Sequence, residues 1–159
     1  MKPAEKSLPQ AKTVDLGVAA WSAFLRTHAT VVRRLERAVE AQTGLPLSWY
    51  DVLLELNAAD ERRLRMQPLA ERVVLSRTRV SRLVDEMVGA GMVDKLPDPA
   101  DRRATFAAIT DRGRKALRTA APVYLAGIEE HFSSHLRRKQ LETIRDGLEQ
   151  VLTAHHAAE

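Results

Sequence analysis

One segment in the middle of the chain carries hydroxyl and guanidinium side chains at a spacing suited to nucleic acid. The exposed side of a predicted helix over residues 77–90 presents Thr78, Arg79, Ser81 and Arg82. Arginine pairs bidentately with guanine, and serine or threonine hydroxyls can reach bases or phosphates. The pattern therefore predicts a helix that enters a major groove by its N-terminal end. The alternative is an ordinary amphipathic helix whose arginines are only solvated.

The opposite side of this helix must be buried, and a second helix must precede it. Its apolar residues recur at the i, i+3, i+4 spacing of one helical face: Val80, Leu83, Val84, Met87 and Val88. Ser76 is the expected N-cap and Gly91 the expected stop. Pro68 suits the first turn of a preceding helix that runs to about Val74. The short turn between the two helices, around Leu75, indicates a helix-turn-helix.

After this helix the apolar period changes from helical to alternating. Two strand-like runs, residues 92–96 and 104–109, flank a tip of turn-forming and charged residues over 97–103. Such a hairpin directly after a helix-turn-helix predicts a wing, and Arg102 and Arg103 at its tip suit a minor groove. Alternatively, one of these arginines only ties the wing down. Arg77, at the edge of the buried stripe, is expected either to contact phosphate or to pair with an acid such as Asp101.

The positive charge of the chain is concentrated in the same region. The net charge is +4, yet residues 60–118 hold 14 Lys and Arg against 9 Asp and Glu. A polyanion would therefore be drawn to the middle of the chain. A solvated basic surface is the alternative interpretation.

Helices are predicted on both sides of this region. The first spans about residues 14–42 and ends at Thr43-Gly44, and a second spans 49–58 with Ser48 as N-cap. The charged stretch 60–65 is compatible with a very short strand. Thr110 and Asp111 open a long helix to about Leu136, which Pro122 should kink, and a last helix covers about 139–154.

Five motifs in this order resemble the MarR family of winged-helix regulators. They are LSWYDVLLEL from Leu47, LAER from Leu69, SRTRVSRLVD from Ser76, DPADRRA from Asp98 and ITDRGR from Ile109. The resemblance implies a mainly α fold with a small β-wing, and obligate homodimers that bind palindromic double-stranded DNA. It implies one domain over 1–159, with dimerisation helices at 14–42 and 111–156 and a winged helix-turn-helix lobe at 45–110. The DNA-binding residues it implies are Ser76, Arg77, Thr78, Arg79, Ser81, Arg82, Asp101, Arg102 and Arg103.

The ends of the chain are consistent with a dimer. The first and last helices carry apolar stripes outside the winged-helix core, and packing on two-fold mates would bury them. Packing of the same helices within a monomer is the alternative. The resemblance also implies a small phenolic or anionic effector between the dimerisation helices and the lobe. The candidate residues there are Trp21, His28, Trp49, Tyr50 and Asp51, although a tryptophan in such a stripe is more often part of a core or interface.

Composition excludes several other kinds of protein. The chain has no cysteine, which excludes disulfides, thiolate zinc sites and thiol switches. No apolar run approaches the length of a membrane span and no secretory signal is evident, so a cytoplasmic location is expected.

Catalysis and metal binding are also not expected. We find no phosphate loop, cofactor motif or activated nucleophile, and the adjacent Asp85 and Glu86 point about 100° apart on a helix. His131 and His135 have zinc-compatible helical spacing but lack a third ligand. We therefore expect a ligand-responsive repressor, with a non-specific architectural DNA-binding protein as the alternative. The predicted helix over 77–90 and the wing, together called the reading head, would also serve an activator.

Overall fold

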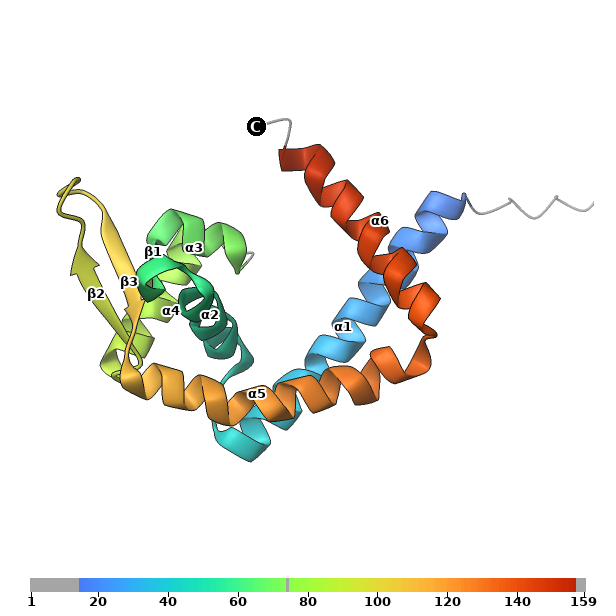
Figure 1. Cartoon of the computed structure of the whole chain (residues 1–159), viewed down its shortest axis with the longest axis horizontal. Helices are drawn as coiled ribbons and strands as arrows, with labels where there is room; N and C mark the ends of the chain where they lie inside the picture. Colours follow the sequence, from blue (N-terminus) through green and yellow to red (C-terminus); the bar gives the residue numbers. More distant parts are fainter. Residues whose placement is uncertain (1–14, 74, 157–159) are drawn as a thin grey trace, which may run out of the picture.

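The computed structural model describes residues 15–73 and 75–156, and these residues form six α-helices and a three-stranded sheet (Figure 1). The helices are α1 (Leu16–Thr43), α2 (Leu47–Ala58), α3 (Met66–Arg72), α4 (Arg77–Gly89), α5 (Asp111–His131) and α6 (Arg138–His156). The strands are β1 (Arg63–Arg65), β2 (Val93–Pro97) and β3 (Thr105–Ile109), and two short 3-10 helices are η1 (Asp60–Arg62) and η2 (Ser133–His135). The expected mainly helical fold with a small β-wing is confirmed.

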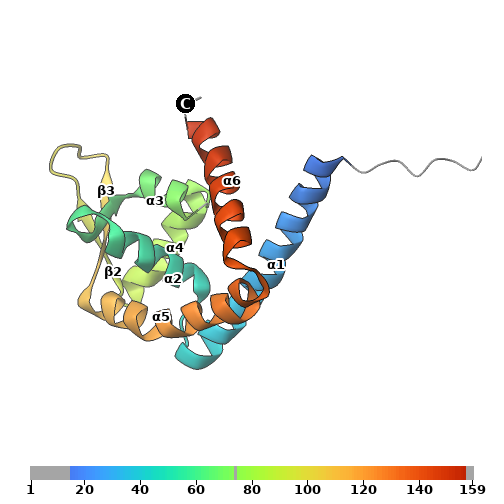
Figure 2. The ribbon, with the colours of Figure 1, turned by 45° about the vertical axis from the view of Figure 1, so that its right-hand side comes forward.

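The elements form a lobe and a pair of helical arms. Helices α2, α3 and α4 and the sheet lie together at one end, and α5 runs from this lobe to the other end (Figures 1 and 2). There α1 crosses α5 and its N-terminal half extends away from the lobe, whereas α6 leaves the end of α5 and leans back toward the side of the lobe. Helix α5 packs mainly against α1 and, less extensively, against α2. We call α1, α6 and the distal half of α5 the arms.

Most helix ends follow the expected local chemistry. Gly44 takes the left-handed conformation with φ 71° after α1, and the Ser76 side chain accepts from the Arg79 N–H at the start of α4. The prediction that Ser48 caps α2 is wrong, because α2 begins at Leu47, two residues before the expected start, and Pro46 occupies the cap position. Pro46 already has a suitable φ, its carbonyl accepts from the Tyr50 N–H at 3.1 Å, and the added residue Leu47 is buried.

The sheet has the order β1-β3-β2 and is antiparallel throughout. Ala107 of β3 pairs with Leu64 of β1 and Lys95 of β2, on the face directed to the helices. Phe106 pairs with Arg65 and Leu96, on the opposite face. Alternation of side chains along the strands therefore separates the apolar inner residues from an outer face that carries cation and aromatic groups.

The core fills the space between α2, α4, the sheet and the start of α5. Leu53, Leu56, Leu69, Val80, Val84, Met87 and Val93 are fully buried there. The buried stripe predicted for α4 is thus confirmed at Val80, Val84 and Met87, whereas Val88 remains exposed at the end of the helix. Among the described residues, no helix has the length and apolar character needed to cross a membrane.

Thr110 joins the turn after α4 and the end of β3 to α5. Its backbone N–H donates to the Met92 carbonyl at 3.1 Å, and its hydroxyl donates to the Gly91 carbonyl at 2.8 Å. The same hydroxyl oxygen accepts from the Gly113 N–H at 3.0 Å and so caps α5. The turn that follows α4, the end of the wing and the start of α5 therefore meet at one residue.

The far end of α5 differs from the expectation of one helix to about Leu136. Pro122 lies inside α5, and the helix continues past it to His131. The helix then ends because Phe132 leaves the helical region, with φ −137° and ψ −68°, and η2 follows. His131 and His135 therefore do not share the continuous helical face assumed from their spacing.

Candidate nucleic-acid interface

The exposed side of α4 carries the polar residues that were predicted from the sequence to contact DNA. Arg77, Thr78, Arg79 and Arg82 are exposed, Ser81 is half-buried, and Ser76 is the exposed N-cap. No acidic residue lies in the first turn of α4. The free N–H groups and partial positive charge of this helix end therefore add to the arginines instead of being neutralised.

The wing is the hairpin of β2 and β3 with the turn over residues 98–104, and its tip projects from the lobe (Figure 1). Arg102 and Arg103 are exposed at this tip. Asp101 is also exposed, and its carboxylate accepts from the Arg103 N–H at 2.9 Å. Asp101 thus shapes the backbone that carries the two arginines, and the structure shows no ion pair between it and any described residue, Arg77 included.

Five arginines on α4 and at the wing tip have no ion-pair partner among the described residues. Within residues 15–73 and 75–156, none of Arg77, Arg79, Arg82, Arg102 and Arg103 has an acidic partner at ion-pair distance. Other arginines of the lobe are paired, for example Arg72 with Glu55 at 3.7 Å. The arginines of α4 and the wing tip are therefore among the exposed cations of the lobe that remain available to an external anion.

Two ion pairs that sequence analysis missed hold the wing against its neighbours. Lys95 of β2 pairs with Asp85 of α4 at 2.5 Å, which ties the wing to α4. Arg65 of β1 pairs with Asp98, whose side chain is only 3% exposed. A signal for Asp98 was present in the sequence, because aspartate in a turn accepts from the N–H two residues on, as Asp98 does from Ala100 at 2.8 Å.

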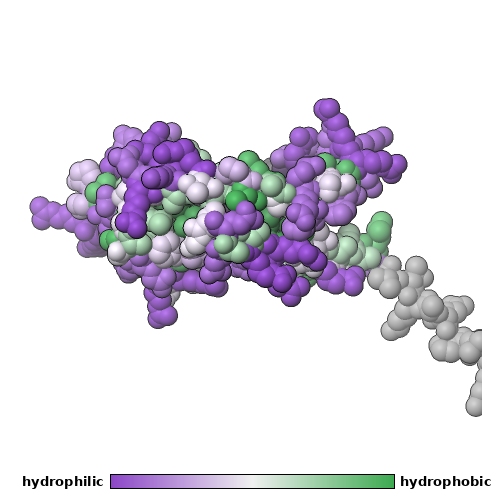
Figure 3. Space-filling view, turned by 90° about the horizontal axis from the view of Figure 1, so that it is seen from below, coloured by the Kyte–Doolittle hydropathy of each residue, from purple (hydrophilic) through white to green (hydrophobic). Residues whose placement is uncertain are grey.

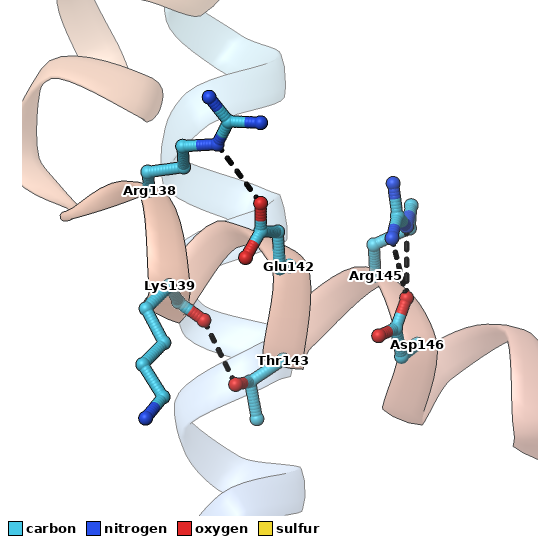
Figure 4. A network of polar contacts seen from close by, with 6 residues as sticks. All are labelled: Arg138, Lys139, Glu142, Thr143, Arg145 and Asp146. Atoms are coloured by element: carbon cyan, nitrogen blue, oxygen red, sulfur yellow. Dashed lines mark hydrogen bonds and ion pairs between the residues drawn. The ribbon is translucent and has the colours of Figure 1, made fainter.

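The arms present a large apolar surface. Trp21 and Leu25 of α1 and Leu148, Val151 and Leu152 of α6 are each at least 40% exposed. On the face shown in Figure 3, hydrophobic side chains lie next to the first described turns of α1 and near the middle of the molecule, among hydrophilic ones. On α6, local polar contacts such as the 2.9 Å bond from Arg138 to Glu142 and the pair of Arg145 with Asp146 satisfy the polar side chains without covering the apolar ones (Figure 4).

A groove of about 800 Å³ separates α1 from α6. Its walls are mostly apolar, with Phe24 and Val31 on α1, Phe132 at the end of α5 and Leu148 on α6. His28, His131 and His135 also line it. No group of three or more histidine, aspartate or glutamate residues suited to a metal ion occurs among the described residues.

The five effector candidates lie in two places. Trp21 and His28 are exposed on α1, on either side of Phe24, with ring centroids 5.8 and 6.3 Å from that of Phe24. The other three, Trp49, Tyr50 and Asp51, lie on α2 at the junction with α5.

The α2 cluster is tightly packed. The buried Tyr50 ring contacts Tyr124 of α5, with ring centroids 4.6 Å apart. Burial raises the pKa of the Asp51 carboxyl, and the negative charges of Glu55 and Glu36 raise it further. Burial and then the charge of Asp51 raise the pKa of Tyr124. The structure thus assembles two phenols and a carboxyl between the lobe and the arms.

Comparison with known proteins gives one consistent family. Residues 43–104 match the model of the MarR family. The fold is similar to that of AbsC, a MarR family transcriptional regulator from Streptomyces coelicolor, with TM-score 0.81 and 26% identity over 94% of this chain and 100% of that one. A second MarR family regulator from Streptomyces coelicolor, solved in complex with DNA, is similar with TM-score 0.81 and 26% identity over 92% of this chain and 91% of that one.

CouR from Rhodococcus jostii, bound to p-coumaroyl-CoA, is similar with TM-score 0.72 and 25% identity over 89% of this chain and 94% of that one. No curated protein sequence matches the chain significantly.

Proposed function

We propose that this chain, a member of the MarR family by its fold and by the sequence of its winged helix, is a repressor that binds a palindromic DNA operator as a homodimer. The observation that carries the proposal is the set of five unpaired arginines on α4 and the wing tip. A duplex that met both elements at once would be contacted in a major and an adjacent minor groove.

Sequence-specific reading is favoured over charge neutralisation by the chemistry of α4. Its exposed first two turns offer arginines and a hydroxyl instead of lysines, and arginine is the side chain that reads guanine bidentately. Lysine-rich neutralisation of phosphate carries no sequence information. The similar regulator from Streptomyces coelicolor that was solved in complex with DNA supports DNA binding by this fold.

The test is selection of duplexes from a random pool at near-physiological salt, followed by sequencing. Recovery of a palindrome with half-sites about one helical turn, roughly 34 Å, apart is expected for a two-fold dimer. Recovery of no enriched sequence, together with a steep salt dependence of binding, would instead indicate a non-specific architectural protein. Repression itself is tested by a reporter fused to the selected site, and activation of that reporter would overturn this part of the proposal.

The homodimer is supported by the apolar surface of the arms. Monomeric soluble proteins rarely expose contiguous apolar patches larger than a few hundred Å², and here Trp21 and Leu152 are each 59% exposed on helices that flank one groove. An isologous contact between two sets of arms would bury both. Sedimentation equilibrium at micromolar concentration should give twice the chain mass, and a monomer would refute this part of the proposal.

We further propose that a small phenolic or anionic effector weakens DNA binding. The similarity to CouR, which was solved with p-coumaroyl-CoA, supports an effector of this kind. The two tryptophans allow its position to be tested, because Trp21→Phe and Trp49→Phe each leave a single tryptophan, whose emission can be followed by itself. Saturable quenching that survives in Trp21→Phe and disappears in Trp49→Phe would place the effector beside α2. The reverse would place it on α1, and no quenching across a panel of phenolic acids would contradict the proposal.

A further inference from the structure

Asp98 is distinguished from the other wing residues by the number of its connections. Its N–H donates to the Ala104 carbonyl at 3.1 Å, and its carbonyl accepts from the Asp101 N–H at 3.3 Å. Its Oδ1 accepts from the Ala100 N–H at 2.8 Å, and its Oδ2 is paired with Arg65. All four polar groups of this residue are therefore used to close the wing tip or to attach it to the lobe.

The partner of Asp98 is itself held in place across the sheet. The Arg65 guanidinium lies over the Phe106 ring, 5.7 Å from its centroid, and Arg63 lies over the same ring at 4.7 Å. Phe106 is on the central strand β3, whereas Asp98 follows directly after β2. Arg65 thus reaches from one edge strand over the centre of the sheet to the residue that follows the other edge strand.

The neighbours of Asp98 restrict it further. It lies between Pro97, the last residue of β2, and Pro99, and proline fixes φ on both sides of it. Hydrogen bonding from the Ala100 N–H and then the charge of Arg65 lower the pKa of the Asp98 carboxyl, although burial opposes them. The carboxylate form is therefore the one that organises the tip at neutral pH.

We propose that Asp98 is the positioning residue of the wing: paired with Arg65, it fixes the tip so that Arg102 and Arg103 are presented to DNA in a preorganised conformation. The proposal rests on the proposed function, because the two arginines are taken to contact DNA. Preorganisation matters because a loop that is ordered only on binding loses conformational entropy at that step. A carboxylate that never contacts DNA can in this way strengthen the binding of a polyanion.

The sign of the effect separates this proposal from simple electrostatics. Asp98→Asn and Asp94→Asn each remove one negative charge from the same hairpin, and Asp94 of β2 is exposed and makes no ion pair with any described residue. Loss of a negative charge alone should strengthen DNA binding in both variants. Positioning predicts that Asp98→Asn instead weakens binding about tenfold, on the scale of ordering a few loop side chains, while Asp94→Asn does not weaken it.

Two further variants distinguish loss of the ion pair from a general loss of folding. Arg65→Gln leaves the Asp98 carboxylate buried without its counter-charge, so its effect should exceed that of Asp98→Asn. The double variant Arg65→Gln with Asp98→Asn removes both charges and should recover part of the affinity lost in Arg65→Gln. Equal affinity in the double variant and in Arg65→Gln would overturn the pairing.

The deciding experiment is a double-mutant cycle in which the affinity of the full chain for the selected operator is measured by fluorescence anisotropy. In the Arg102→Ala, Arg103→Ala background, Asp98→Asn should cause no further loss beyond about twofold, because a positioning residue acts only through the groups it positions. A loss that persists in this background, or an Asp98→Asn variant that binds as tightly as Asp94→Asn, would overturn the proposal.

A second readout does not depend on DNA. Amide exchange of Ala100, Arg103 and Ala104 should be faster in Asp98→Asn than in the unsubstituted chain, while core amides such as that of Val84 should be unchanged. Equal exchange at the tip would refute the proposal. If the chain binds no DNA sequence at all, the proposed function fails, and the exchange data still decide whether Asp98 orders the tip.

Discussion

Gly113 should be intolerant of even one added methyl group. It lies in the first turn of α5, where it is buried and donates its N–H to the Thr110 hydroxyl. A Cβ at this position would lie 2.2 Å from the Met92 carbonyl oxygen, 2.9 Å from Ile109 and 3.0 Å from Leu53. The first of these contacts is with backbone that is itself bonded to Thr110, so no side-chain rotation relieves it.

The magnitude follows from two opposing effects. Overpacking of a core costs about 1–3 kcal/mol and sometimes more, while alanine is favoured over glycine inside a helix by about 1 kcal/mol. Because the clash is with backbone, we expect the upper part of the range and a net loss of about 1–2 kcal/mol in the free energy of unfolding for Gly113→Ala. For a chain of this size that corresponds to a decrease of roughly 2–8 °C in Tm.

The assay is thermal unfolding followed by circular dichroism at one fixed protomer concentration, since the Tm of a protein that associates depends on its concentration. Gly89→Ala is the matched control, because Gly89 is also in a helix and its Cβ would meet nothing within 4 Å. This control should leave Tm unchanged or raise it. A Gly113→Ala variant that melts at or above the unsubstituted chain would refute the close approach of α5 to the Met92 carbonyl.

Three further perturbations test the reading head, the junction and the arms. Arg82→Ala should cost about 1–3 kcal/mol of binding free energy on the selected operator and relax its sequence preference; unchanged affinity and preference would contradict the role of α4. The raised pKa of Asp51 means that the fold favours the protonated carboxyl over the ionised one. The stabilisation that the protonated form provides is therefore lost as pH rises through the folded pKa. Asp51→Asn should therefore have a larger free energy of unfolding in urea at pH 7, and the gain should disappear toward the ordinary aspartate pKa of about 3.9. Leu148→Asp, in the wall of the groove, should shift sedimentation from dimer to monomer, whereas Gln150→Asp on the same helix should not.

The reading head was predictable because its signals are local. The apolar stripe of α4, the cap at Ser76 and the change of period after Gly91 each depend on a few adjacent residues, and each is present in the structure. The start of α2 was not predicted correctly, because Ser48 resembles a cap by type while burial of Leu47 favours the earlier start. Tertiary packing decided that boundary.

The attachment of the wing could not be predicted, because it joins residues far apart in sequence. Nothing near Arg65 indicates that its partner is Asp98, 33 positions later, and only the sheet order places β1 beside the wing strand β3. The end of α5 was missed for a related reason, since no breaker residue follows His131 and the chain leaves the helix at an ordinary phenylalanine.

The joint at Thr110 gives α5 the properties of a lever. The helix has 21 residues and is therefore about 32 Å long at 1.5 Å per residue. A rotation of about 10° at one end displaces the other end by roughly 5 Å, close to half the width of a major groove. The three hydrogen bonds that converge on Thr110 are the pivot of this lever, so a small angular change there becomes a displacement of several ångström of the arms relative to the lobe.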